Sequence, residues 1–317
     1  MMNKTESASA FSSNPLISIV IPAYNAAPYL RQAIDSVLKQ DYPHVELLVL
    51  DDGSTDDTRD ILRGYGNRFS WESHANMGQS ATINKGWRMA KGEIWSYLSA
   101  DDALTSDAVR KAIPYLRDGV VLAYGDFNLI DSSSRHIRRV EAPDFNYQDM
   151  FSRLICHPGP GVFMKRQAVE AAGFWDVVYR QMPDYDLWLR LGLQGRFVRV
   201  PEVLAFFRVH EQSQTFAVAD EQRAMEPVRI VSRFIETQSL PADLLSLKTM
   251  ALGNAWLVTA QLQIRSGRFR GGLQALRRSF SLCPRNFFYP RTLRILSNSL
   301  FNRTLHRLVR WKNRILH

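Results

Sequence analysis

The chain has 317 residues, of which 45% are hydrophobic and 22% charged, as in an ordinary folded protein. This composition excludes intrinsic disorder, collagen and coiled-coil rods. Two cysteines are too few for a disulfide framework or a structural zinc site. No segment reaches the roughly 18 apolar residues that a membrane-spanning helix needs.

The formal net charge of +9 is concentrated near the C-terminus. Eight of the 40 Lys and Arg residues lie between Arg285 and His317, where there is no Asp or Glu. The other 32 nearly balance the 31 acidic residues, so we expect no nucleic acid as a partner. Residues 1–14 are polar and carry no apolar stretch of the kind found in secretory signals. We therefore expect a disordered leader and a cytoplasmic protein.

Apolar runs and amphipathic segments alternate along the first third of the chain. Strands are predicted at 16–21, 45–50, 69–71 and 94–98, and helices at 28–40, 55–65 and 78–90, the second of these with Ser54 or Thr55 as its N-cap. Strands that alternate with helices in this way form βαβ units around a parallel sheet. The fold class is therefore α/β.

The later part of the chain divides near residue 215. Before this point we predict strands at 120–124, 127–130, 135–140 and 203–209 and a helix at 185–193. Beyond it the pattern is helical only, at 220–236, 241–264 and 269–282. The predicted organisation is a leader at 1–14, an α/β domain at 15–215 and a helical region at 216–317.

The first strand–helix turn is not a phosphate-binding loop. Its sequence, Pro22 to Pro28, contains no glycine, and no Gly-Lys-Ser/Thr follows. Dinucleotide-binding dehydrogenases and P-loop kinases are therefore excluded. The second strand instead ends at Asp51 and Asp52, at the sheet edge where open α/β sheets bind ligands. These carboxylates could accept bonds from a base or a ribose, or could simply belong to a turn and a helix cap.

Six blocks of sequence, in order, resemble the family 2 glycosyltransferases. They are Ser18–Asn25, Asp51–Asp57, the Asn76–Gly78 block with Asn84–Gly86 and Ala90–Glu93, Leu98–Asp102, Asp184–Arg190, and Arg208–His210 with Ser213. The resemblance covers roughly residues 16–215. It implies the GT-A fold with a mixed, mostly parallel sheet, a nucleotide-diphosphate sugar donor (a UDP-sugar first), Mn²⁺ or Mg²⁺, and inversion at the anomeric carbon.

The resemblance also implies roles for particular residues. Pro22, Ala23, Tyr24 and Asn25 would wrap the nucleoside, Asp52 would contact the base, and Ser99 and Ala100 would lie in the donor site. Asp101 and His210 would bind the metal, and Asp184 would be the general base. Asp102, Arg208 and Trp188 are further candidates for contacts with the diphosphate or the acceptor.

Physical chemistry supports these roles and leaves alternatives open. A hard cation stabilises charge on a leaving diphosphate, and Mn²⁺ accepts a histidine more readily than Mg²⁺ does. At the start of a helix, the dipole is expected to lower the pKa of Asp184 and make it a weak base. Alternatively, Asp102 caps a turn, Trp188 packs in the core, Arg208 pairs with a structural carboxylate and His210 has no ligand.

Three positions depart from the family pattern. Ser99 stands where an acidic residue is usual, Ile83 where Arg is common, and Pro183 where Glu often precedes the base. A degenerate member that binds nucleotide-sugar or glycan without turnover is therefore one alternative. A nucleotidyltransferase is another, although such sites usually need a Gly-rich phosphate loop. The Gln-x-x-Arg-Trp signature of processive members is absent, which favours transfer of a single sugar.

The segment from Arg285 to His317 interleaves its cations with large apolar residues. A basic amphipathic helix of this kind is typical of a membrane-surface element, and packing on the protein body is the equal alternative. The expected function is transfer of one sugar to a glycan or lipid-linked acceptor at the inner face of the cell membrane, in cell-surface polysaccharide synthesis.

Overall fold

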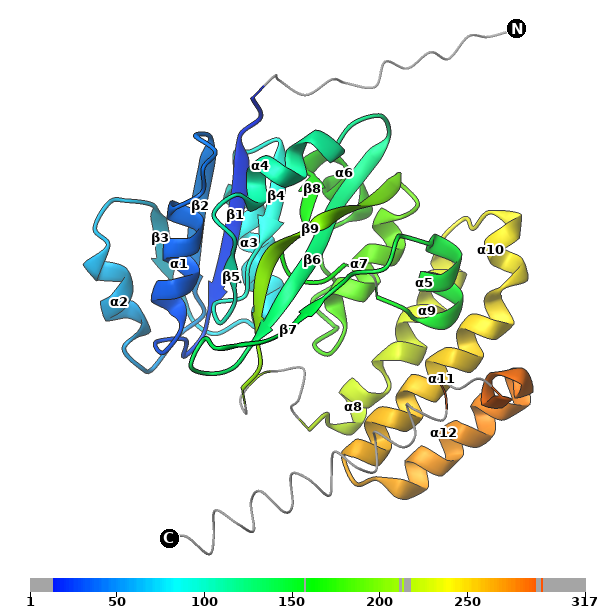
Figure 1. The fold of residues 1–317 in the computed structure, drawn as a ribbon. Helices are drawn as coiled ribbons and strands as arrows, with labels where there is room; N and C mark the ends of the chain where they lie inside the picture. The colour runs from blue at the N-terminus through cyan, green and yellow to red at the C-terminus, as the bar shows by residue number, and fades with distance from the viewer. Residues whose placement is uncertain (1–13, 157, 211–212, 214–217, 289–291, 293–317) are drawn as a thin grey trace, which may run out of the picture. The chain divides into compact units, whose positions relative to one another are not determined.

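A computed structural model describes residues 14–156, 158–210, 213, 218–288 and 292 (Figure 1). The expected leader and nearly all of the basic tail lie outside these residues. The chain divides into two compact units: Met1–Phe145, Cys156–Val178 and Pro183–Ser213 form the first, and Asn146–Ile155, Tyr179–Met182 and Gln214–His317 form the second. The domain limits drawn from the sequence stay a prediction, because a compact unit need not fold independently.

The first unit is built on one mixed sheet. Its described strands are ordered β3-β2-β1-β4-β8-β6-β9-β5, with β7 paired to β6. Their bounds are β1 (Ile17–Ala23), β2 (Val45–Asp51), β3 (Ser70–Ser73), β4 (Ile94–Tyr97), β5 (Ala103–Leu104), β6 (Val120–Ile130), β7 (His136–Val140), β8 (Phe163–Lys165) and β9 (Arg196–Arg208). Strands β3, β2, β1 and β4 are mutually parallel, and antiparallel pairs through β8 join them to the parallel pair of β6 and β9.

Helices cover both faces of this sheet. On one face, the Ile17, Ile19 and Ile21 side chains of β1 belong to a buried cluster with residues of α1 (Leu30–Leu38), α2 (Thr58–Gly64) and α4 (Ala108–Ala112). On the other face lies α3 (Gln79–Met89), whose Gly86 sits so close to Val20 that a Cβ there would be 2.5 Å from the valine side chain. A strand buried on both sides needs mostly apolar residues, as β1 has apart from Ser18, whose hydroxyl donates to Glu46.

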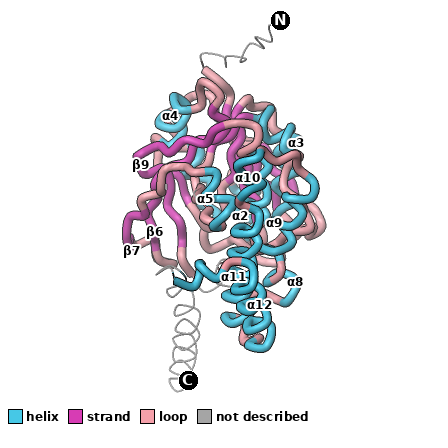
Figure 2. Tube along the Cα trace, turned by 90° about the vertical axis from the view of Figure 1, so that its right-hand side faces the viewer, coloured by secondary structure: helices cyan, strands magenta, loops and turns pink. Residues whose placement is uncertain are grey.

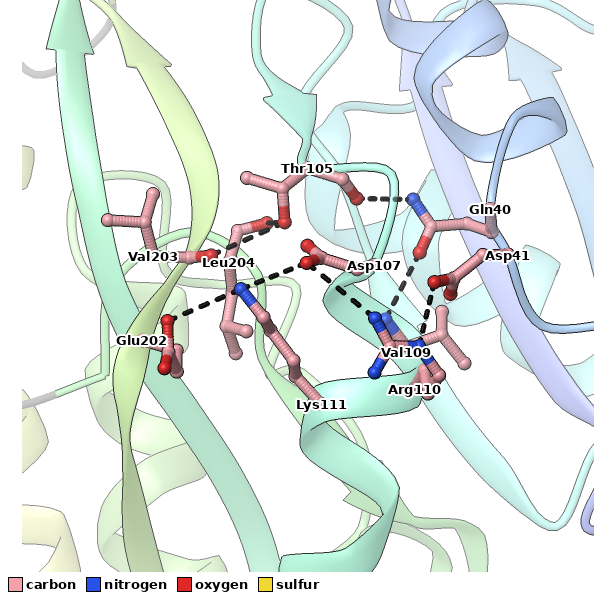
Figure 3. A network of polar contacts seen from close by, with 10 residues as sticks. All are labelled: Gln40, Asp41, Thr105, Asp107, Val109, Arg110, Lys111, Glu202, Val203 and Leu204. Carbon is pink, nitrogen blue, oxygen red and sulfur yellow. Dashed lines mark hydrogen bonds and ion pairs between the residues drawn. The ribbon is translucent and has the colours of Figure 1, made fainter.

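A polar network holds β5 and α4 against β9 (Figure 3). The Gln40 amide donates to the Thr105 carbonyl at 2.6 Å and accepts from the Val109 N–H at 3.1 Å, which ties the end of α1 to the start of α4. Lys111 on α4 bridges to Glu202 on β9 at 3.3 Å. Residues on three elements that are far apart in sequence are thereby joined at this end of the sheet. The first unit also contains η1 (Ile113–Tyr115), α6 (Arg166–Ala172) and α7 (Pro183–Leu191).

The second unit is helical in its described part. Its elements are α5 (Tyr147–Arg153), α8 (Glu221–Ala224), α9 (Glu226–Thr237), α10 (Ala242–Ser246), α11 (Lys248–Arg265), α12 (Phe269–Leu282) and η3 (Pro284–Phe288). Helices α11 and α12 run side by side (Figures 1 and 2). None of the helices within the described ranges has both the length and the apolar character needed to cross a bilayer.

The α/β class and the helical C-terminal region are confirmed, and several element limits differ from the sequence-based expectation. The expected strands 120–124 and 127–130 are one strand, β6. The expected helix 220–236 is two helices, because Pro227 in the first turn of α9 has no N–H for a continuous helix. Neither Ser54 nor Thr55 caps α2, whose N-cap is Asp57.

A buried carboxylate connects three strands at the β6 side of the sheet. Asp126 on β6 is fully buried and accepts from Arg139 on β7 at 2.7 Å, from Arg199 on β9 at 3.0 Å and from the Ala142 N–H at 3.0 Å. Burial alone would raise the pKa of Asp126, but the two guanidinium groups outweigh it and the pKa is lowered.

We predict that Asp126→Asn destabilises the protein by about 2 kcal/mol at pH 7, because charge-assisted bonds to buried groups are lost. The difference in the free energy of unfolding between wild type and variant is fully present above the pKa of an unfolded Asp. It disappears as the pH falls through the lower pKa of Asp126 in the folded protein. Urea unfolding at neutral and acid pH measures both effects. The control is Asp144→Asn, since Asp144 is 92% exposed and lies 3.8 Å from Arg199, and it should change stability little. Equal losses in both variants would contradict the prediction.

Candidate functional site

Three loops of the first unit meet at one edge of the sheet. In the parallel register Ala23 of β1 lies beside Asp51 of β2, and the Asp52 N–H donates to the Ala23 carbonyl at 2.8 Å. On the other side of β1, the Leu98 N–H donates to the Val20 carbonyl at 2.9 Å. The segments that follow Ala23, Asp51 and Tyr97 therefore leave the sheet at the same edge, while Pro22 and Ala23 are themselves buried residues of β1.

The loop after β1 is shaped by side chains of the loop after β2. Asn25 has a positive φ of 49°, its N–H donates to the Ser54 hydroxyl at 2.9 Å, and its side-chain oxygen accepts from the Thr55 N–H at 2.8 Å. The Ala27 N–H donates to the Asp56 carboxylate at 3.1 Å. These contacts leave Tyr24 55% exposed, so an aromatic ring faces solvent at the predicted nucleoside loop.

Asp52 organises the neighbouring loop. Its buried carboxylate accepts from the backbone N–H groups of Met77 at 2.6 Å and Gly78 at 3.0 Å. The backbone after Asp52 passes so near that loop that a Cβ on Gly53 would be 2.9 Å from the nitrogen of Asn76, and Gly53 also has a positive φ of 77°. Only glycine fits both conditions. Both Asp52 oxygens keep further lone pairs for a base.

His74 is a candidate that the sequence patterns missed. Its Nδ1 lies 3.6 Å from the Asp52 carboxylate and 3.0 Å from the Ala75 carbonyl. Its buried Nε2 has no hydrogen-bond partner within the described ranges. A buried ring nitrogen without a partner is costly, so a ligand contact at this position is chemically reasonable. No sequence signal identified it, because His74 stands outside the matched blocks.

Asp101 and His210 meet beyond the end of β4. Asp101 Oδ2 and His210 Nε2 are 2.9 Å apart, and the His210 ring lies 4.9 Å from the ring of Tyr29. The Asp101 side chain is 30% exposed and that of His210 12%, so one oxygen and one nitrogen donor lie together in a partly exposed position. Among the described residues no group of three His, Cys, Asp or Glu side chains could hold a metal. The pair nonetheless fits a divalent cation that takes its other ligands from phosphate oxygens.

Arg208 is a structural residue of this edge. The side chain is 1% exposed and donates to the Asp101 carbonyl at 2.8 Å, the Asp131 carbonyl at 2.9 Å and Gln32 at 2.7 Å. It also lies over the Tyr29 ring, 4.6 Å from its centroid. Because each guanidinium nitrogen already donates to a protein atom, Arg208 is not placed as the expected contact to a diphosphate. Its role is instead to hold the loop that carries Asp101.

Asp102 is neither a turn cap nor an exposed ligand. Its buried carboxylate accepts the Arg208 N–H at 2.8 Å and so binds the loop to β9. Burial and the neighbouring Asp101 raise the pKa of Asp102 well above its usual value. Trp188 is fully buried and packs edge-on to Phe197 at 6.3 Å, so it belongs to the core and offers no stacking surface to a sugar.

Asp184 is the second residue of α7, and its environment corrects the expectation from the helix dipole. Burial raises the pKa of the Asp184 carboxyl, although the Tyr185 N–H donates to it at 2.8 Å. Desolvation therefore outweighs the helix terminus, and Asp184 is a stronger base than expected. Burial and the charge of Asp184 also raise the pKa of Tyr97, the last residue of β4.

Comparison with known proteins agrees with this geometry. Residues 18–171 match the model of "Glycosyl transferase family 2". Over 64% of its length the chain is 33% identical to an uncharacterized glycosyltransferase of Rickettsia typhi, of which the match covers 66%. Over 66% of its length it is 31% identical to the chondroitin synthase of Escherichia coli, of which the match covers 31%. The chain thus spans just under two thirds of the first relative and about a third of the second.

Two solved structures share the fold at low sequence identity. One is S. aureus TarS 1-349 in complex with UDP-GlcNAc, with a TM-score of 0.60 and 15% identity, covering 86% of this chain and 92% of that one. The other is the mannosyltransferase PcManGT from Pyrobaculum calidifontis in complex with GDP-Man and Mn²⁺, with a TM-score of 0.60 and 18% identity, covering 93% and 87%.

The family match spans the first four of the six sequence blocks, and the solved structures agree with the mixed sheet. Residues 18–171 form a glycosyl transferase family 2 domain, and the chain has the GT-A fold.

Proposed function

We propose that the protein transfers one sugar from a nucleotide-diphosphate donor to a hydroxyl group of a glycan or lipid-linked acceptor. The observation that carries this proposal is the approach of Asp101 and His210 to 2.9 Å at the sheet edge where the loop of Asp52 also begins. Proteins of the same fold bind UDP-GlcNAc and GDP-Man, which supports a nucleotide-sugar donor, with a UDP-sugar as the first to test.

In this proposal the donor's nucleoside lies between the loop Pro22–Asn25 and the Asp52 carboxylate. The exposed Tyr24 ring offers it an apolar surface, and the His74 nitrogen offers a polar contact beside Asp52. Ser99 and Ala100 precede the metal-binding position and would lie along the ribose. Ser99 can still hydrogen-bond a ribose hydroxyl, although the usual carboxylate is absent.

Asp101 and His210 would hold Mn²⁺ or Mg²⁺ together with the donor phosphates. When bound, the ion would stabilise the negative charge that develops on the leaving diphosphate. Arg208 keeps Asp101 in place through its bond to the Asp101 carbonyl. Mn²⁺ suits the mixed oxygen and nitrogen donors better than Mg²⁺ does, and a neighbour of the same fold carries Mn²⁺.

Asp184 would accept the proton of the acceptor hydroxyl as its oxygen attacks the anomeric carbon. The new bond forms on the face opposite to the bond that breaks, so the electron pair of that bond leaves with the diphosphate. A single displacement without a covalent enzyme intermediate inverts the anomeric centre. We further propose a non-processive role in cell-surface polysaccharide synthesis, with peripheral attachment to the inner membrane face through the basic segment Arg285–His317.

We expect Asp184→Asn to lower kcat by about 10²–10⁴-fold while the affinity for the nucleoside diphosphate stays within about twofold. An amide cannot accept the hydroxyl proton but occupies the same volume. Transfer assays and calorimetric titration separate the two effects. The matched control is Asp60→Asn, which removes an exposed carboxylate of α2 and should leave kcat unchanged. Full activity of Asp184→Asn would overturn the base assignment, whereas a wild type that binds the nucleoside diphosphate without any transfer would favour the degenerate alternative.

The pH dependence follows from the direction of the Asp184 shift. The base works only when ionised, so kcat/KM should fall as the pH falls through its pKa. Because burial raises this pKa above the ordinary value of 3.8, the midpoint of the acid limb should lie above pH 3.8. A profile from about pH 3 to about pH 8 measures it. A midpoint below the ordinary value, or an identical limb in the residual activity of Asp184→Asn, would refute the assignment.

Chelation of the metal should abolish transfer, and added Mn²⁺ should restore it. We expect Asp101→Asn and His210→Ala each to weaken Mn²⁺ binding by about tenfold or more in the presence of a nucleoside diphosphate, since each removes one direct ligand. Electron paramagnetic resonance of free Mn²⁺ provides the measurement. Asp41→Asn and His44→Ala are matched controls, because both precede β2 at the opposite end of that strand. Unchanged Mn²⁺ affinity in Asp101→Asn would remove the metal from the proposal.

A further inference from the structure

The second unit carries an unusual distribution of charge. After Asp243 the sequence contains no Asp or Glu as far as His317. Helices α11 and α12 lie within this acid-free stretch, so their cations have no carboxylate nearby in sequence. The positive charge on the surface of these helices can be neutralised only by carboxylates from earlier in the chain or by anions of a partner.

One face of α12 is already used for packing. Gly272, Ala275 and Ser279 are its buried residues. A Cβ on Gly272 would lie 2.6 Å from the Ile264 side chain, and the Ser279 hydroxyl donates to the Gly253 carbonyl of α11 at 2.7 Å. Close approach through small residues therefore fixes which side of α12 turns toward α11.

A different face of α12 exposes large apolar side chains. Phe269, Leu273 and Phe280 are 52%, 50% and 52% exposed. Their spacings of four and seven residues place them in one stripe along the helix. At its C-terminal end the Phe280 ring meets Phe287 of η3 with 5.4 Å between the ring centroids, so the stripe continues onto the next element. This face of α12 therefore presents an apolar stripe to solvent.

Cations border this stripe. Arg270 and Arg277 are exposed and seven residues apart, so they share the face next to the apolar residues. Two neighbouring arginines have internal roles instead. Arg268 donates to the Ala219 carbonyl at 2.7 Å, and Arg278 lies 5.3 Å from the centroid of the Trp256 ring. The helix thus separates structural cations from cations available to a partner.

We propose that this face of α12, defined by Phe269, Leu273, Phe280, Arg270 and Arg277, binds the surface of an anionic phospholipid bilayer. A helix lying in the bilayer interface needs an apolar stripe flanked by Lys or Arg. Anionic headgroups supply the counter-charges that the chain lacks after Asp243. This surface belongs to α12 and is distinct from the segment Arg285–His317 proposed above as a membrane attachment. The proposal does not depend on the glycosyl-transfer chemistry.

The test uses the full chain and sedimentation with phosphatidylcholine vesicles, with and without phosphatidylglycerol. The wild type should bind only the anionic vesicles, and added salt should weaken binding. Arg270→Gln with Arg277→Gln should lower the partition coefficient about 25-fold, since each cation near the surface contributes roughly fivefold. Leu273→Gln should lower it about tenfold, because an apolar side chain is lost from the interface.

Matched controls lie elsewhere in the second unit. Arg229→Gln with Lys248→Gln removes the same charge from exposed positions on α9 and α11. Leu245→Gln changes a leucine that is 43% exposed on α10. These variants should bind vesicles nearly as wild type. Thermal unfolding and nucleoside-diphosphate binding of every variant show that the fold is intact and keep this test separate from the proposed enzymatic function.

Three results would overturn the proposal. The first is unchanged vesicle binding by the α12 variants, which would assign any binding to the tail alone. The second is unchanged binding together with a lower melting temperature for Leu273→Gln, which would mean that another part of the chain covers this face. The third result combines two observations. The arginine variant, but not Leu273→Gln, loses vesicle binding, and the arginine variant loses binding to a DNA oligonucleotide to the same extent. This result would indicate a surface that binds any polyanion.

Discussion

The parallel pairing of β1 with both β2 and β4 is the constraint on which the site depends. Parallel strands end at the same edge of a sheet, so every loop that leaves these three strands begins within a few residues of the others. The chain can therefore carry its polar residues in short, separate segments and still assemble them. β1 is buried on both faces, which is why its register tolerates little change.

Buried polar groups then determine the shape of the loops at this edge. Asp52 holds the loop of Met77 and Gly78 through backbone N–H groups, and Arg208 holds the loop of Asp101 through a backbone carbonyl. Both side chains are almost fully removed from solvent, where hydrogen bonds to charged groups are strongest. Such loops present their remaining polar atoms with little conformational freedom, as a binding site for a charged donor requires.

Two carboxylates of the first unit show how environment decides protonation. Asp126 is fully buried and Asp184 is partly buried, and burial opposes the charge of each. Two guanidinium groups reverse the effect at Asp126, whose pKa is lowered, whereas Asp184 has only backbone N–H bonds and its pKa is raised. The first therefore suits a structural ion pair, and the second suits proton transfer.

Local sequence determined the α/β class, the alternation of strands and helices, the helical C-terminal region and the residues at strand ends, because periodicity and turn residues act over a few positions. Only the tertiary structure showed that Arg208 and Trp188 are buried, that His74 lies beside Asp52 and that Asp184 is desolvated. Those properties depend on residues distant in the chain, as when Arg208 meets Asp101 across more than a hundred positions. A sequence pattern contains no information on how far a side chain is removed from solvent. Burial, however, decides whether an arginine such as Arg208 binds a ligand or supports the fold, and whether a carboxylate such as Asp184 is a weak or a strong base.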